Sequence, residues 1–491
     1  MSEVKASDAT PINTLDDVWH NYEGAGANSK AGIEVVLTFL NPNTPKLVPM
    51  SLAQNRDLKN IAADSLPDAG DWVHNEPTAE LLEVASIAGT PAQITDVLND
   101  TNRKIKALSQ SANRLGLKRS YFQDLPDKTA DELLAHIMDV ERYNIMYAPY
   151  REDMYECVRY FAVCKSNQVS ISPRDPDQML RDVRRLYCLA PFLFMLTDNT
   201  SAYSEGKPFS GSAPMALRAN GLGQGRGGNV PPHVFTARSG EEFIAAHVHH
   251  AMNNPLFMYY DLDGQLQRVP SGDWSVTFNA LKARGLNTAS NYYLAQSLLW
   301  PDVKIAALKN SAGDVTGHRY EARMFGVGLH QHQTGFLITS ALAFNKTLAA
   351  QVDDLLDEFG FESSDPAQLK TMVENAYDAA RNHNGKFFDI AYGTGTMAAF
   401  AKSFADLIEN ANDEPDLEEA LIPLLSICRT GCTDAKVNRL LFPTLEDINK
   451  FQRSHDPKIF ENPNSCARLL FAKEIKSLKG DNHCTGLSSA A

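Results

Sequence analysis

The sequence predicts an α+β protein, and two observations support that fold class. β-branched runs typical of strands, and long segments with apolar residues at helical spacing, are interleaved irregularly over the first 345 residues. This order differs from the regular strand–helix alternation of a doubly wound parallel sheet. From about residue 346 onward the chain becomes helical and acidic in pattern.

The first elements can be located from composition and periodicity. Residues 1–30 are polar, rich in Asp, Asn and Gly, and predict a loosely ordered lead-in. Residues 31–42 form a β-branched run that ends in a turn, and residues 78–86 (TAELLEVAS) predict a second strand. Residues 91–116 have apolar residues at helical spacing, with a proline at the start and a glycine at the end, so they predict a helix.

Further along, the pattern predicts a helix over residues 129–150 and a strand over 155–172. Residues 175–196 predict a long helix. A loop-rich centre, residues 197–232, is dense in Gly, Ser and Asn, and residues 235–345 mix short strands and helices.

Composition narrows the possible functions. The formal net charge of −14 argues against a general nucleic-acid binder, because that role needs a basic surface. The most apolar stretch, Leu186–Leu196, is too short to span a bilayer, so no membrane association is expected. The first residues do not have the pattern of a signal peptide, and the seven cysteines are scattered. We therefore expect free thiols and a cytoplasmic location.

Acidic residues stand inside two apolar runs, where a charge is costly unless it is paired or bound to a metal. Glu34 lies within GIEVVLTF, and Glu83 lies within ELLEVAS, close to Glu76. A strand-edge position facing solvent is the alternative for Glu34. Hard cations such as Mg²⁺ take oxygen ligands from a few carboxylates. Carboxylates from several strands of one sheet would meet that need.

The segment HRYEARMFG places Arg319, Glu321 and Arg323 at two-residue spacing, so in a strand their side chains project from one face. Guanidinium groups bind phosphate in bidentate fashion, so this stripe fits a site for a nucleoside triphosphate and its metal. A solvated sheet face carrying an ion pair is the alternative. Arg218, beyond the loop TDNTSAYSEGKPFSG, is a further candidate for an anion.

Five segments in order over roughly residues 30–345 resemble motifs of the glutamate–cysteine ligase family, within the glutamine synthetase-like carboxylate–amine ligases. GIEVV resembles the first-strand motif G-[IL]-E-x-E, and EPTAELLEVAS is similar to the acidic E/D…LLE segment. CKSNQVSIS matches the position of the QVNxD strand. TDNTSAYSEGKP…ALR resembles the loop NSPxxxGKPxG…R, and HRYEARMFG resembles the RxxExR strand.

The resemblance implies a curved, mainly antiparallel six-stranded sheet with surrounding helices, which forms an open funnel with ATP and divalent metals at one end. Residues 31–345 would form this catalytic domain, and residues 346–491 a mostly helical region packed on it. The implied roles are metal ligands for Mg²⁺ or Mn²⁺ (Glu34, Glu76, Glu83, Glu321), catalytic groups (Arg323, Arg218), ATP-binding groups (Arg319, Arg323) and substrate-binding groups (Arg218, Gln168, Asn199, Ser201).

Two departures from the family pattern affect these roles. The second glutamate of the first-strand motif is Val36 here, which removes one metal ligand. The QVNxD strand has Ser170 and Ser172 where Asn and Asp are expected. The number of metal ions and the identity of the amine substrate are therefore open.

The resemblance implies an ATP-dependent carboxylate–amine ligase, in which the γ-carboxylate of glutamate is joined to the amine of cysteine through an acyl phosphate, as in glutathione biosynthesis. A different amino acid or amine acceptor is the nearest alternative. Two others are a degenerate member that binds nucleotide or amino acid without catalysis, and phosphoryl transfer to an amine or guanidino acceptor without ligation. The expected partners are small molecules, and the oligomeric state is open.

Overall fold

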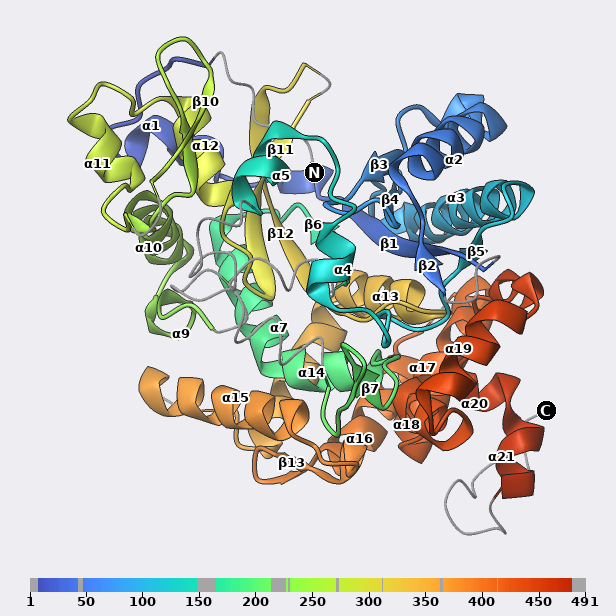
Figure 1. Cartoon of the computed structure of the whole chain (residues 1–491). Coiled ribbons are helices and arrows are strands. Elements are labelled where there is room, and N and C mark those ends of the chain that lie inside the picture. The colour runs from blue at the N-terminus through green and yellow to red at the C-terminus, as the bar shows by residue number, and fades with distance from the viewer. Residues whose placement is uncertain are drawn as a thin grey trace.

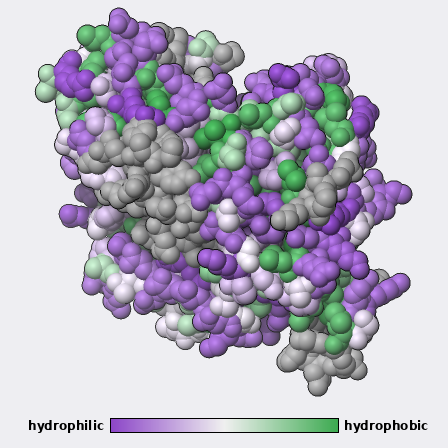
Figure 2. Space-filling model, in the orientation of Figure 1, coloured by the Kyte–Doolittle hydropathy of each residue, from purple (hydrophilic) through white to green (hydrophobic). Residues whose placement is uncertain are grey.

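The computed structural model describes residues 8–42, 47–147, 165–212, 227, 230–270, 273–310, 312–362, 365–412 and 414–478. Within these ranges, no helix combines the length and the apolar character needed to cross a membrane. The face of the molecule in Figure 2 is mostly hydrophilic, with hydrophobic residues in scattered groups.

A curled sheet of six strands lies at the centre of the molecule (Figure 1), and every neighbouring pair in it is antiparallel. The predicted α+β class with a six-stranded antiparallel sheet is confirmed. Two short strands, β2 (Val48–Pro49) and β5 (Lys118–Arg119), pair with the end of β1. In spatial order the six strands are β11 (Val303–Lys309), β12 (Val315–Phe325), β6 (Asn167–Ile171), β1 (Ala31–Asn41), β4 (Leu81–Ala85) and β3 (Val73–Asn75).

The two faces of the sheet differ in chemistry because side chains alternate along each strand. On β1, Ile33, Val35 and Leu37 are almost fully buried and belong to the main apolar core. The intervening positions carry Glu34 and Val36 on the opposite face. The sheet therefore has an apolar face and a polar face.

Three helices pack against the sheet and cover its apolar face. These are α3 (Ile94–Arg114), α7 (Pro176–Leu196) and α13 (Gln331–Phe344), and they contact β1, β6 and β12. Asp175 caps α7 by accepting a hydrogen bond from the Gln178 backbone N–H, with Pro176 in the first turn. These sequence signals are why residues 175–196 were predictable as a helix.

The helical C-terminal region, residues 346–478, lies below the sheet in Figure 1, from orange to red. Many of its buried side chains belong to the main apolar core that it shares with the sheet. Others, such as Val437, Phe442 and Ile448, form a second apolar cluster. Its helices are α14 (Lys346–Glu358), α15 (Pro366–Arg381), α16 (Met397–Asn410), α17 (Glu418–Thr430), α18 (Asp434–Leu441), α19 (Leu445–Ser454), α20 (Ala467–Leu470) and α21 (Ala472–Leu478).

The remaining elements are short and lie around the sheet. One of them is α2 (Leu52–Ser65), which lies beside β3 and β4. On the opposite side lie α9 (His233–Thr236), α10 (Gly240–Asn253), α11 (Phe278–Lys282), α12 (Ala289–Ser297) and the hairpin of β9 (Met258–Tyr260) and β10 (Leu266–Arg268).

Two local expectations need correction, and a third is only partly tested. The segment 8–30 is ordered, because Tyr22 is fully buried and its ring stacks on His318 with centroids 3.6 Å apart. Residues 129–150 do not form one helix. They contain α4 (Ala130–Leu134) and α5 (Glu141–Met146), because the chain between them pairs with the segment before β4. Of the predicted strand over residues 155–172, residues 155–164 lie outside the described residues, and Asn167–Ile171 form the strand β6.

The expectation of free thiols is only partly met. Cys188, Cys428 and Cys466 are buried free cysteines. Cys432, however, is disulfide-bonded. The scattered spacing of the cysteines gave no indication of that bond.

Candidate active site

The polar face of the sheet collects polar and charged side chains from four adjacent strands. Residues directly opposite each other in an antiparallel pair project from the same face. Glu34 on β1 is opposite Gln168 on β6, and Glu321 on β12 is opposite Ser170 on β6. Lys304 on β11 is opposite Glu321. The register therefore brings together residues that lie up to 287 positions apart, since Glu34 and Glu321 share this face.

Arg319, Glu321 and Arg323 form a continuous ion-pair array. Arg319 Nη2 lies 3.0 Å from Glu321 Oε2 and 3.4 Å from Glu34 Oε1. The Arg323 guanidinium donates to the other Glu321 oxygen. Glu321 is 2% exposed and Arg323 8%. This burial excludes the solvated sheet face that was the alternative for the stripe.

The pKa values of Glu321 and Lys304 show a surplus of positive charge at this end of the face. Burial acts to raise the pKa of Glu321, but the charges of Arg323, Arg319 and Lys304 lower it to about 2. Burial lowers the pKa of Lys304 to about 7, and Arg323 acts in the same direction while Glu321 opposes it. An anionic group such as a phosphate would be stabilised here.

The pKa values of Glu34 and Glu83 show the opposite imbalance on β1 and β4. Burial raises the pKa of Glu34 to about 7, with the charge of Glu83 adding to the rise and Arg319 opposing it. Burial likewise raises the pKa of Glu83 to about 7, and Glu76 and Glu321 add to it. A cation beside these carboxyl groups would relieve the repulsion.

No group of three or more His, Cys, Asp or Glu side chains within the described ranges is arranged to hold a metal ion. The nearest donor set is Glu34 and Glu83, with Glu76 close to Glu83. These oxygen donors and their excess negative charge suit a hard cation. Glu321 is already engaged by two arginines, so it is the least available of the four predicted ligands.

Gln168 and the residues that depart from the family pattern can now be placed. Gln168 Nε2 donates to Glu83 Oε2 at 3.3 Å, so the amide bridges β6 and β4. Ser170 is opposite Glu321, and its hydroxyl is buried without a hydrogen-bond partner. Ser172 is used structurally, because its Oγ accepts from the Lys30 backbone N–H at 2.8 Å. Val36 is opposite Glu83, so the lost carboxylate would have been beside Glu83.

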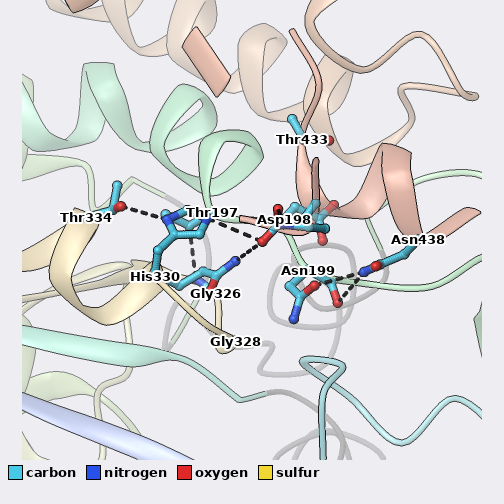
Figure 3. A network of polar contacts seen from close by, with 12 residues as sticks. Thr197, Asp198, Asn199, Gly326, Gly328, His330, Thr334, Thr433 and Asn438 are labelled. Atoms are coloured by element: carbon cyan, nitrogen blue, oxygen red, sulfur yellow. Dashed lines mark hydrogen bonds and ion pairs between the residues drawn. The ribbon is translucent and has the colours of Figure 1, made fainter. Parts of the chain in front are cut away.

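The loop after α7 is held by a buried polar network (Figure 3). The Asn199 amide donates to the carbonyls of Tyr121 and Val327 and accepts from Asn438 at 2.8 Å. Ser201 Oγ donates to the Tyr203 carbonyl. Both residues are nearly fully buried, so the described structure uses them to anchor the loop. A role for them in substrate binding stays a prediction, and Arg218 lies outside the described residues.

A pocket lies over the arginine array, and two parts of it were not predicted from the sequence. These are Lys304 and the wall formed by two helices. Lys304 is the one charged residue in the apolar run VKIAAL, the same signal that singled out Glu34. The wall comes from α5 and α12, whose polar residues carry no motif. The pocket is lined by Glu34, Arg142, Gln168, Tyr293, Gln296, Ser297, Lys304, Ala306, Ala307, Lys309, Arg319, Glu321 and Arg323.

Comparisons with known proteins give a structural match only. No family model and no curated protein sequence matches the chain. Among solved structures, the chain is similar to a glutamate–cysteine ligase from Francisella tularensis in complex with AMP, determined at 2.0 Å. The match has a TM-score of 0.49 and 11% sequence identity, and it covers 94% of this chain and 96% of the other.

Proposed function

We propose that this chain is an ATP-dependent carboxylate–amine ligase that activates the γ-carboxylate of glutamate as an acyl phosphate and joins it to the amine of cysteine. The observation that carries the proposal is the charge separation on the polar face. Arg319 and Arg323 supply positive charge next to carboxyl groups whose pKa values are raised, and Lys304 adds to it when it is protonated. Phosphoryl transfer from ATP needs both kinds of group side by side.

The arginine array suits the phosphoryl group. Arg323 would donate to the oxygens of the transferring γ-phosphoryl group, and Arg319 would bind the neighbouring phosphate. Glu321 fixes both guanidinium groups before substrate arrives, since it pairs with each of them. Preorganised donors of this kind lower the barrier because they need no rearrangement as charge moves.

Glu34, Glu83 and Glu76 would hold Mg²⁺ or Mn²⁺, with Gln168 orienting Glu83. When bound, such an ion supplies positive charge to the phosphate oxygens of ATP. Val36 leaves β1 with one carboxylate where the family pattern has two, so we propose fewer metal ligands on this strand.

The proposed reaction takes place in two steps. A γ-carboxylate oxygen attacks the γ-phosphorus of ATP and ADP leaves. The neutral amine then attacks the acyl carbon, phosphate leaves with one former carboxylate oxygen, and the nitrogen releases one proton to solvent. Cysteine is the proposed amine, and the serines at positions 170 and 172 favour keeping another amino acid or amine as the alternative. The proposed location is the cytoplasm, where these substrates are available.

The test is ATP-dependent phosphate release, measured with glutamate against a panel of amino acids and amines. The ligase releases phosphate only when glutamate and its amine are both present, and a dipeptide accumulates in equal amount. Full activity after exhaustive removal of divalent cations with a chelator would contradict the assignment of Glu34, Glu76 and Glu83 as metal ligands. A binding member without catalysis releases no phosphate with any pair. Phosphoryl transfer without ligation gives a phosphorylated acceptor, which mass spectrometry detects.

A further inference from the structure

A second pocket lies on the helix-covered side of the sheet. Arg119 on β5 is opposite Phe39 on β1, and Phe39 belongs to the apolar face. The cavity has a volume of about 280 Å³. We call it the Arg119 pocket. Its walls come from α3, β5, the start of α13 and the 3-10 helix Pro457–Glu461 of the C-terminal region.

Arg119 is a buried cation without a carboxylate partner among the described residues. It is 6% exposed, and its guanidinium donates one hydrogen bond, from Nη2 to the Gly328 carbonyl at 2.7 Å. The same group stacks over the Phe460 ring at 4.4 Å. Burial alone lowers its pKa, to about 9, so it remains protonated at neutral pH. A guanidinium has five N–H donors, so most of its donor capacity is unused.

The groups around Arg119 leave the pocket with a positive balance. Arg103 is already paired, with Asp68 at 3.0 Å and with Asp100 at 3.3 Å, while Lys106 is exposed at the mouth. Glu461, also exposed, is the acidic residue in the lining.

His332 adds no charge to the lining. Burial lowers its pKa to about 3, and the charge of Arg119 adds to this effect, so the ring is neutral at physiological pH. Its Nε2 lies 2.8 Å from the Asn102 side-chain oxygen, which accounts for one ring nitrogen. The neutral histidine neither compensates nor adds to the buried cation.

We propose that the Arg119 pocket binds a small carboxylate with a short apolar body. A buried charge is costly without a counter-ion, and a carboxylate is the anion that a guanidinium fork matches with two parallel hydrogen bonds. Ile105, Leu329 and Phe460 give the cavity apolar walls for the rest of such a molecule. This site is separate from the polar face and does not depend on the proposed ligase activity.

The test uses benzoate as the anionic probe and benzyl alcohol as its neutral counterpart, with the full chain and isothermal titration calorimetry. Wild type is expected to bind benzoate saturably and benzyl alcohol at least about 10-fold more weakly, since the charged hydrogen bonds are lost. Arg119→Met should weaken benzoate binding by about 10-fold or more. Arg323→Met is the matched control on the polar face and should bind benzoate as wild type does.

Lys106→Glu keeps the test decisive if Arg119→Met does not fold, because position 106 is exposed. This variant should weaken benzoate binding by about 2- to 5-fold through charge at the pocket mouth. A crystal structure with benzoate should show its carboxylate on the Arg119 guanidinium. The proposal is overturned if wild type shows no saturable binding, if both pocket variants bind as wild type does, or if benzoate binds elsewhere.

Discussion

Individual carboxyl groups on the polar face differ in pKa because their neighbours differ. Glu321 sits between two arginines and opposite a lysine, so its pKa is lowered to about 2. Burial raises the pKa of Glu34 to about 7, with the charge of Glu83 adding to the rise. Burial also raises the pKa of Glu83 to about 7, with Glu76 adding to it. Positive charge is therefore in excess around Glu321, and negative charge is in excess around Glu34 and Glu83. A bound phosphate would compensate the first excess, and a bound cation would compensate the second.

Glu83→Gln should change stability in a pH-dependent way. Since the pKa of Glu83 is raised on folding, its contribution to stability is present below about pH 4.5 and is lost as pH rises through about 7. The variant should match wild type near pH 5 and be more stable near pH 8, by at most about 3 kcal/mol. Urea unfolding at both pH values measures this, with the exposed Glu241→Gln as control.

The same Glu83→Gln variant should have no measurable ligase turnover, because the substitution removes a proposed metal ligand. A large loss of stability at pH 8 would show instead that the Glu83 carboxylate holds the sheet together. Retained turnover would remove Glu83 from the metal site.

Arg323→Lys should lower kcat on the order of 10²-fold or more, because lysine keeps the charge but loses the planar fork. The KM for ATP should change much less, since the contact matters mainly once charge has moved. Steady-state kinetics of the variant measure both. Wild-type turnover in Arg323→Lys would contradict an active-site role for the array.

At the scale of the element, β12 separates structural and chemical roles by face. Arg319, Glu321 and Arg323 point to the polar face, while Tyr320 points to the apolar face. There the Tyr320 hydroxyl donates to Asp182 Oδ2 on α7 at 2.9 Å. Packing of the apolar face of β12 on α7 thus holds the arginines in place on the polar face.

Tyr320→Phe should lower the free energy of unfolding by about 1–3 kcal/mol, because it leaves a buried carboxylate with one donor fewer. The kcat should stay close to wild type, since the hydroxyl is on the face away from the site. Chemical denaturation and steady-state kinetics check the two parts. Tyr203→Phe, which removes a hydroxyl bond at a more exposed position, is the control and should cost less.

How far the sequence predicts each element depends on how local its causes are. The strand of residues 31–42 and the helix of residues 175–196 were predictable, because alternation, capping and proline placement act within a few residues. The helix expected over residues 129–150 is interrupted because Thr78 bridges Ile137, and that pairing is tertiary. Spacing suggested the array of Arg319 to Arg323. A charge inside an apolar run could have singled out Lys304, but its place opposite Glu321 depends on a register that no local pattern encodes.

At the scale of the whole molecule, the sheet and the helical C-terminal region meet in a buried polar network, part of which is shown in Figure 3. Asp434 at the start of α18 accepts from the Gln331 amide and from the Ala467 backbone N–H, each at 2.7 Å. His330 Nε2 lies 3.3 Å from the same carboxylate, and its Nδ1 is bonded to Thr334. The segment after β12 is thereby tied to the C-terminal helices.

Asp434→Ala should lower the free energy of unfolding by about 3 kcal/mol or more, because several buried donors lose their partner. Chemical denaturation of the full chain measures this. Asp416→Ala, at an exposed position, should be within about 0.5 kcal/mol of wild type. Equal stability of the two variants would show that this network does not stabilise the packing of the sheet against the C-terminal region.

The central claim is that the polar face activates a carboxylate by phosphorylation. The most direct measurement supplies glutamate labelled with oxygen-18 in its γ-carboxylate, together with ATP and the amine found in the panel. Acyl-phosphate chemistry predicts one labelled oxygen in each phosphate released, in step with dipeptide formation. Released phosphate without label, at the same turnover, would contradict the account.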